Sequence, residues 1–194
     1  MAKNLENKLG NSKTYSFDEA VEDSKEYFKG DEMAAKNFLR KYALKDSEGN
    51  LYESNPDQMH QRLAGEVGRI EQKYENPLRK DKIYNLVKDF KYIVPQGGPM
   101  AGIGNENQIA SLSNCFVIGK KEDSYGNIMK TDEEQVQLMK RRGGVGHDLS
   151  HIRPDRTSVQ NSALTSTGVV PFMERYSNST REVAQDGRRG ALML

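Results

Sequence analysis

The sequence predicts a helical region followed by an α/β region, and three observations support this fold class. Apolar residues recur at helical spacing through roughly the first 90 positions. Glycine and proline then gather in VPQGGPMAGIGNENQ, residues 94–108, where that spacing stops. Beyond this segment, short apolar runs alternate with helical segments, as they do in an α/β sheet or barrel. We therefore expect a helical region at residues 1–93 and the first strands and helices of an α/β domain at residues 94–194.

The composition is that of a globular chain. Its 194 residues are 35% hydrophobic and 29% charged, which provides enough apolar material for a core. No apolar stretch reaches the length of a membrane span, and MAKNLENKLGNSKTYSF at the N-terminus lacks the apolar middle of a signal peptide. We expect a cytoplasmic protein. The net charge of +1 gives no reason to expect a membrane or a nucleic acid as partner.

The helices of the first region have recognisable start signals. Ser16 and Glu19 form a capping box for the first helix. A second helix follows Gly30, and Asn55 with Pro56 supplies an N-cap and a first-turn proline for a third. The apolar residues expected to face the core lie on the first, third and fourth helices: Phe17, Ala20, Val21, Phe28; Met59, Leu63, Val67, Ile70; and Ile83, Leu86, Val87, Phe90.

The second region opens with CFVIG, residues 115–119, a short strand too apolar to have one face in water. Such a strand is typical of a parallel sheet that is covered on both sides. Thr131 and Glu134 form a capping box that predicts the next helix, and Gly143 with Gly144 predicts its end. VGHDLSHI then predicts a further extended run.

A second helix of this region is expected from about residue 167 to residue 184. The loop QDGRRG follows it, and ALML at residues 191–194 predicts a strand that is cut off at its start, so we expect the α/β domain to be incomplete. The residues expected on the core side of the helix are Val170, Met173, Ser177, Thr180 and Ala184.

The chain contains a single cysteine, Cys115, so it forms no internal disulfide and no zinc site built from paired cysteines. A lone cysteine beside an apolar run is either a small buried hydrophobe or a reactive thiol. A hydrolase that pairs Cys115 with His147 or His151 has no oxyanion signature to support it. His147 and His151 lie about 13 Å apart on an extended strand and lack a third ligand, so we expect polar histidines with satisfied hydrogen bonds and no metal site.

Basic residues are unevenly distributed along the chain. All 17 lysines lie at or before Lys140, whereas residues 141–194 hold eight of the 12 arginines. Because a guanidinium binds phosphate oxygens in pairs, arginines next to glycines in loops indicate phosphate recognition, with surface ion pairs as the alternative.

Several motifs occur in a fixed order from about residue 93 onward: SLSNCFVIG, RRGGVGHDLSHIRP and GVVPFMERYSNSTREVAQDGRRGALML. In this order they resemble the catalytic chain of ribonucleotide reductases. NKLGNS, NFLRKYALKDSEGN and NPDQMHQRLAGEVGRIE are similar to the N-terminal helical region of the same family. The resemblance covers most of the chain.

The resemblance implies a ten-stranded α/β barrel, of which this chain holds only the first part. It makes Cys115, on the first strand, one of two thiols that reduce the 2′ position of a ribonucleotide and become a disulfide. By the same resemblance Ser113 and Asn114 line the substrate site, and Gly144 lets the backbone approach the substrate closely.

The resemblance also implies an allosteric site for an ATP or deoxynucleotide effector at a dimer interface. Asp123 would accept the ribose hydroxyl, with Ser124 and Tyr125 beside it, and Arg153 would bind phosphates. The loop QDGRRG would report the effector to the substrate site. The residues of this loop at the positions that match the family are Gln185 and Arg189, with Arg188 as an alternative.

The resemblance further implies partners. The helix that carries Glu134 and the helix that starts near Thr167 would form a homodimer contact, although core packing alone would also explain their apolar stripes. The remainder of the catalytic chain would supply the radical-bearing cysteine and the second reducing cysteine, so the chain alone is expected to be inactive. Adenosylcobalamin or a separate metal-containing subunit would generate the radical, and a thioredoxin- or glutaredoxin-type protein would reduce the disulfide. The alternative function is that of a non-catalytic fragment that binds nucleotide or dimerises.

Overall fold

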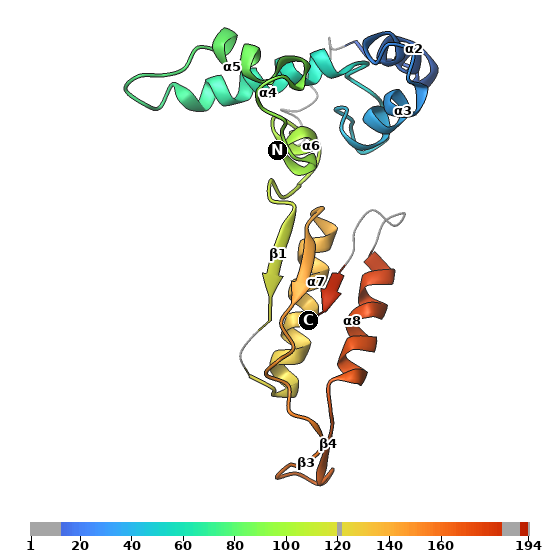
Figure 1. Ribbon diagram of the computed structural model, residues 1–194, viewed down its shortest axis with the longest axis vertical. Helices are drawn as coiled ribbons and strands as arrows, with labels where there is room; N and C mark the ends of the chain where they lie inside the picture. The colour runs from blue at the N-terminus through green and yellow to red at the C-terminus, as the bar shows by residue number, and fades with distance from the viewer. Residues whose placement is uncertain (1–12, 120–121, 184–190, 194) are drawn as a thin grey trace. The chain divides into compact units, whose positions relative to one another are not determined.

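A computed structural model describes residues 13–119, 122–183 and 191–193, the last of these by backbone only. The chain divides into two compact units, Met1–Leu112 and Ser113–Leu194. The first unit is helical and the second combines strands with helices (Figure 1). The described part of the chain contains no helix that is both long and apolar enough to cross a membrane.

Four helices of the first unit confirm the predicted ones, and two short helices follow them. The capping box is present, because the Ser16 hydroxyl accepts from the Glu19 amide and the Glu19 carboxylate accepts from the Ser16 amide. Asn55 caps the third helix through the Gln58 amide, with Pro56 in the first turn. The elements are α2 (Phe17–Tyr27), α3 (Glu32–Lys41), α4 (Pro56–Glu71), α5 (Lys80–Val87), the 3-10 helix η1 (Lys88–Phe90) and α6 (Gly97–Gly102).

The core of the first unit lies where α2, α3 and α4 meet. Most of the predicted stripe residues near the middle of each helix are buried, whereas Phe17, Ile70 and Leu86 are more than a third exposed, so the expected stripes were wrong at their ends. The core cluster comprises Ala20, Val21, Phe38, Leu39, Ala43, Leu51, Met59 and Leu63.

The glycine- and proline-rich segment belongs to the first unit. It forms α6 where the sequence predicted only a break, and Arg62 of α4 holds it in place. The Arg62 guanidinium donates to the Met100 carbonyl at 2.8 Å and to the Ile103 carbonyl, and it forms a largely buried ion pair with Glu53 at 2.7 Å. The division between the units therefore falls after Leu112 and not after residue 93.

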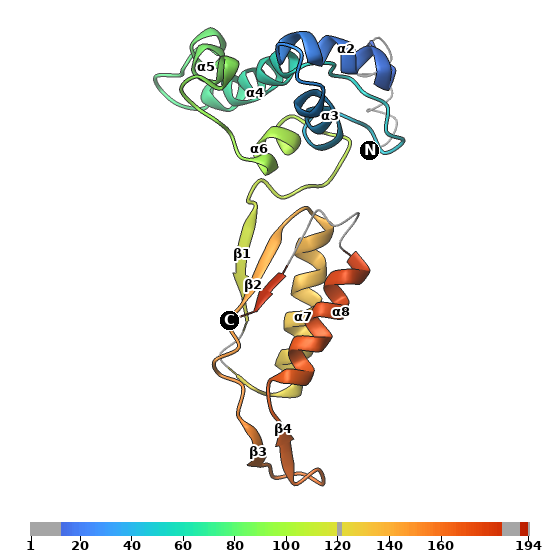
Figure 2. The same ribbon diagram turned by 45° about the vertical axis from the view of Figure 1, so that its right-hand side comes forward.

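The second unit is built on a three-stranded parallel sheet in the order β1-β2-β5. Helices α7 and α8 lie side by side over one face of this sheet (Figure 2). The strand and helix alternation confirms the predicted start of an α/β domain; the described strands form no closed barrel. The elements are β1 (Cys115–Ile118), α7 (Tyr125–Lys140), β2 (Gly144–His147), β3 (Asp155–Ser158), β4 (Thr165–Thr167), α8 (Val170–Val183) and β5 (Ala191–Met193).

The starts of both helices differ from the prediction. Ser124 is the N-cap of α7, so Thr131 lies inside the helix, where its hydroxyl donates to the Asn127 carbonyl. The helix extends back because Ile128 packs with Leu149 in the small core of this unit. Thr167 belongs to β4, and α8 begins three residues later.

The buried side of α8 also differs from the predicted one. Tyr176 and Ser179 are its buried residues, whereas Val170 is 60% exposed. Ala184 lies outside the described residues. On β1, Val117 is 86% exposed on the side away from the helices, so the expected cover on both faces is not seen among the residues that the structure describes.

Candidate functional site

The first predicted group lies at the amino ends of β1 and β2. Cys115 is the first residue of β1, and its register partner is Gly144, the first residue of β2. The Asn114 carbonyl accepts a hydrogen bond from the Gly144 amide at 2.7 Å. Cys115 is exposed. The fold therefore brings Ser113, Asn114, Cys115 and Gly144 together around an accessible thiol.

Gly143 makes this close pairing possible. A Cβ atom at Gly143 would lie 2.9 Å from Cε2 of Phe116 and 3.1 Å from the Leu138 carbonyl oxygen. The left-handed residue that ends α7 is Arg142, with φ of 71°, and not one of the glycines. The glycine thus lets the chain pass directly over the Phe116 ring before β2 pairs beside Cys115.

The second predicted group lies beyond the carboxyl ends of the same two strands. Asp123 follows β1 and Arg153 follows β2. Nη2 of Arg153 donates to Oδ1 of Asp123 at 2.7 Å, its backbone amide donates to Oδ2 at 3.2 Å, and its Nε also donates to Oδ2. The hydrogen bond from the Arg153 side chain lowers the pKa of Asp123 to about 2. The same hydrogen bond raises the pKa of Arg153.

A cavity of about 540 Å³ adjoins this ion pair. All four residues predicted for the effector site line it: Asp123, Ser124, Tyr125 and Arg153. The sequence did not predict the other walls, which come from β4, from the loop that joins β3 to β4, and from Ile128, Ile152 and Phe172. The hairpin pairs β3 and β4 antiparallel, and its exposed serine and threonine residues carry no hydrophobic alternation that would have revealed it.

The ring of Tyr125 lies at the start of α7. It meets Phe172 of α8 in a T-shaped contact, with ring centroids 5.8 Å apart and an interplanar angle of 74°. Ser124 fixes the start of the helix, since its hydroxyl accepts from the Asn127 amide at 3.4 Å. The starts of α7 and α8 and the hairpin lie at the same end of the second unit (Figures 1 and 2).

The two groups are separated along the strand. Cys115 begins β1 and Asp123 follows its other end, and a strand of four residues spans about 10 Å. Gln185, Arg188 and Arg189, predicted for the loop that connects the two sites, lie outside the described residues.

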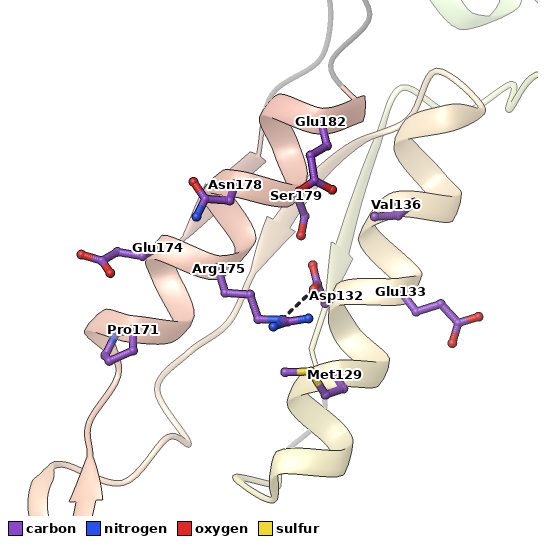
Figure 3. Close-up of a pocket in the computed structure, with 10 residues that line it drawn as sticks. All are labelled: Met129, Asp132, Glu133, Val136, Pro171, Glu174, Arg175, Asn178, Ser179 and Glu182. Atoms are coloured by element: carbon purple, nitrogen blue, oxygen red, sulfur yellow. Dashed lines mark hydrogen bonds and ion pairs between the residues drawn. The ribbon is translucent and has the colours of Figure 1, made fainter.

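A groove of about 670 Å³ runs between α7 and α8 (Figure 3). Nε of Arg175 on α8 reaches Oδ2 of Asp132 on α7 at 2.8 Å across this groove. Glu133, Glu174 and Glu182 also line it, so its charge is predominantly acidic. These are the two helices expected to contact a second copy.

The histidines are placed differently from each other. His147 is buried and stacks on Tyr176, with ring centroids 4.4 Å apart. Both ring nitrogens lack a hydrogen-bond partner among the described residues, so the expectation of a satisfied polar histidine was wrong for His147. Burial lowers its pKa, which keeps the ring neutral at pH 7. His151 follows the end of β2.

No group of three or more histidine, cysteine, aspartate or glutamate side chains in the described ranges is placed to hold a metal ion.

Two family models match the chain. Residues 28–106 match the all-alpha domain of ribonucleotide reductase and residues 113–194 match its barrel domain. The chain belongs to the ribonucleotide reductase large-chain family. The two matches follow each other in the order of the helical unit and the strand-containing unit, and they meet close to the division between them.

Curated ribonucleotide reductase chains from distant organisms are similar to this chain. Ribonucleoside-diphosphate reductase large chain 2 of Saccharomyces cerevisiae is 31% identical over 115 residues, covering 58% of this chain and 13% of the yeast chain. The large subunit of Arabidopsis thaliana is 28% identical over 86% of this chain and 20% of its own length. Subunit alpha of Buchnera aphidicola is 28% identical over 91% of this chain and 23% of its own length. The chain thus spans less than a quarter of these relatives.

Proposed function

We propose that this chain supplies the start of the catalytic barrel of a ribonucleotide reductase, and that Cys115 is one of the two thiols that reduce the substrate. The observation that supports this best is the position of Cys115: it is exposed at the first residue of β1, in register with Gly144, within the region that matches the family's barrel domain. The bare backbone at Gly144 leaves room for a substrate beside the sulfur.

The proposed chemistry balances with a second thiol. Replacing the 2′ hydroxyl of the ribose by hydrogen consumes two electrons and two protons and releases water. Two thiols supply both as their sulfurs join in a disulfide, which a thioredoxin- or glutaredoxin-type protein then reduces. Cys115 is the only cysteine among these 194 residues, so we propose that the second thiol lies outside them and that these residues alone do not turn over. The names of the relatives specify a ribonucleoside diphosphate as substrate, which we propose here as well.

The test is reconstitution with a polypeptide that carries the remaining barrel strands. Deoxyribonucleotide formation from a ribonucleoside diphosphate is measured with a dithiol reductant, with and without adenosylcobalamin. Stimulation by adenosylcobalamin would identify it as the radical source; activity that requires a metal-containing subunit would identify the other source. Cys115→Ser should abolish thiol-coupled turnover, whereas Val117→Ser, two residues along the same face of β1, should retain it. Full turnover by Cys115→Ser would refute the proposal.

We also propose that the cavity beside Asp123 and Arg153 binds an ATP or deoxynucleotide effector. The Asp123 carboxylate accepts hydrogen bonds from Nε and Nη2 of Arg153. The Nη1 group of Arg153 has no partner among the described residues, so its N–H groups are available to bind a phosphate. Ser124 and Tyr125 line the same cavity. Gln185, Arg188 and Arg189 would report the bound effector to the substrate site.

The groove between α7 and α8 is the proposed homodimer contact. Its acidic lining would face the same lining of the second copy in a two-fold interface. Like charges that face each other repel, so we expect dimerisation of the chain to strengthen with added salt, as measured by analytical ultracentrifugation.

The alternative function is a fragment that binds nucleotide or dimerises without catalysis. It is favoured by the fact that the cavity and the Asp123–Arg153 pair are formed by this chain alone. Nucleotide binding by the chain together with failure of the reconstituted assembly to reduce ribonucleotides would favour this alternative.

A further inference from the structure

The cavity beside Asp123 and Arg153, proposed above to bind the effector, has an apolar part and a polar part. Ile128, which is buried, and the partly buried Ile152 and Phe172 belong to the same small core and line the cavity. Asp123 and Arg153 supply the charged wall. This division suits a ligand that is apolar and flat at one end and anionic at the other, which is the chemistry of a nucleotide.

Tyr125 presents a large aromatic ring at the surface. It is 66% exposed, and its neighbour in the cavity wall is Phe172, with the two ring centroids 5.8 Å apart. Phe172 packs against the core cluster of Ile128, Leu149 and Tyr176. The Tyr125 ring is therefore supported from the protein side while most of its surface is open to a ligand.

We infer that Tyr125, supported by Phe172, is a platform on which the effector's base stacks while Arg153 binds the phosphates. This inference rests on the proposed effector site. Stacking on an aromatic ring accepts every base, because each base has a π face. The platform therefore contributes affinity for all nucleotides and does not select among them; the choice of base is made by other residues.

The experiment is isothermal titration calorimetry of the full chain with ATP, with each of the four deoxynucleoside triphosphates, and with inorganic tripolyphosphate, which carries the charge without a base. Tyr125→Ala removes the platform and Tyr125→Phe keeps it. Tyr74→Ala, which removes a tyrosine that is 65% exposed in the other unit, is the matched control. Arg153→Gln tests the phosphate contact. Far-UV circular dichroism checks that each variant is folded.

Tyr125→Ala should weaken binding of every nucleotide by a similar factor, about ten- to 100-fold, and leave tripolyphosphate binding unchanged. Tyr125→Phe and Tyr74→Ala should bind as the original chain does, and Arg153→Gln should weaken binding of nucleotides and tripolyphosphate alike. Nucleotide binding that is unaffected in Tyr125→Ala but weakened in Arg153→Gln would overturn the platform and leave the effector site standing. A loss confined to one base would overturn the claim that the platform does not select. Absence of nucleotide binding by the original chain would overturn the effector site and the platform together.

Discussion

Replacement of Gly143 by alanine tests how closely β1 and β2 must approach at the thiol. The new Cβ would lie 2.9 and 3.0 Å from two ring carbons of Phe116 and 3.1 Å from the Leu138 carbonyl oxygen, whereas ordinary contacts begin at 3.4 Å. The ring would have to move by about 0.5 Å, and the helix backbone has little freedom to follow. Overpacking of this kind costs about 1–3 kcal/mol, against a gain of at most about 1 kcal/mol from the reduced entropy of the unfolded chain. We expect a net destabilisation of about 1–2 kcal/mol.

Native-state hydrogen exchange of the β1 and β2 amides measures this effect, since it reports on the second unit separately from the helical one. Gly126→Ala is the matched control, because a Cβ at this position near the start of α7 meets nothing within 4 Å apart from its chain neighbours and the backbone of its own helix. Alanine there should stabilise the unit by about 0.5–1 kcal/mol through its better helix propensity. If Gly143→Ala protected the strand amides as well as the original chain or better, close packing at Gly143 would not be needed for the pairing of β1 with β2.

Two further outcomes follow from the ion pair and from the small core. The pKa of Asp123 falls from 3.8 to about 2 in the folded protein, so the pair with Arg153 stabilises the fold above about pH 4 and this stabilisation is lost as the pH falls toward 2. Because Arg153 is 40% exposed, we expect at most about 1 kcal/mol, measured as the difference in urea unfolding between the original chain and Asp123→Asn at pH 5 and pH 2; equal differences at both pH values would contradict this. Tyr176→Phe removes the hydrogen bond from the buried hydroxyl to the Ile128 carbonyl at 3.2 Å and should cost about 0.5–1.5 kcal/mol, whereas Tyr74→Phe at an exposed position should cost almost nothing in the same unfolding assay.

Two capping motifs show what could be predicted about the fold. Ser16 and Glu19 form the predicted capping box, with Ser16 in extended backbone as the N-cap of α2. Thr131 and Glu134 have the same spacing, yet they lie inside α7. The motif is local, whereas the true start depends on Ile128 reaching Leu149 and Tyr176, which are distant in sequence. Tertiary contacts therefore decided where this helix begins.

The candidate site was predictable where it depends on the ends of parallel strands. Residues just after β1 and β2 necessarily come close together, and Asp123 and Arg153 are in contact in the structure. The ion pair between these two residues was not predicted. The family motif indicates how each side chain would contact a ligand, and it does not indicate whether the side chains contact each other. The hairpin wall and Phe172 were missed because their placement depends on pairing between exposed polar strands.

The open edges of the parallel sheet matter for handling the protein. Within the described ranges β1 and β5 each pair with β2 alone, so the outer backbone groups of both strands have no strand beside them. Unpaired strand edges are templates for adding further strands, from a proper partner or from another molecule of the same kind. A concentrated preparation of this chain should therefore tend to aggregate through these edges, and a polypeptide that adds the next strands should suppress that aggregation before any catalytic test is made.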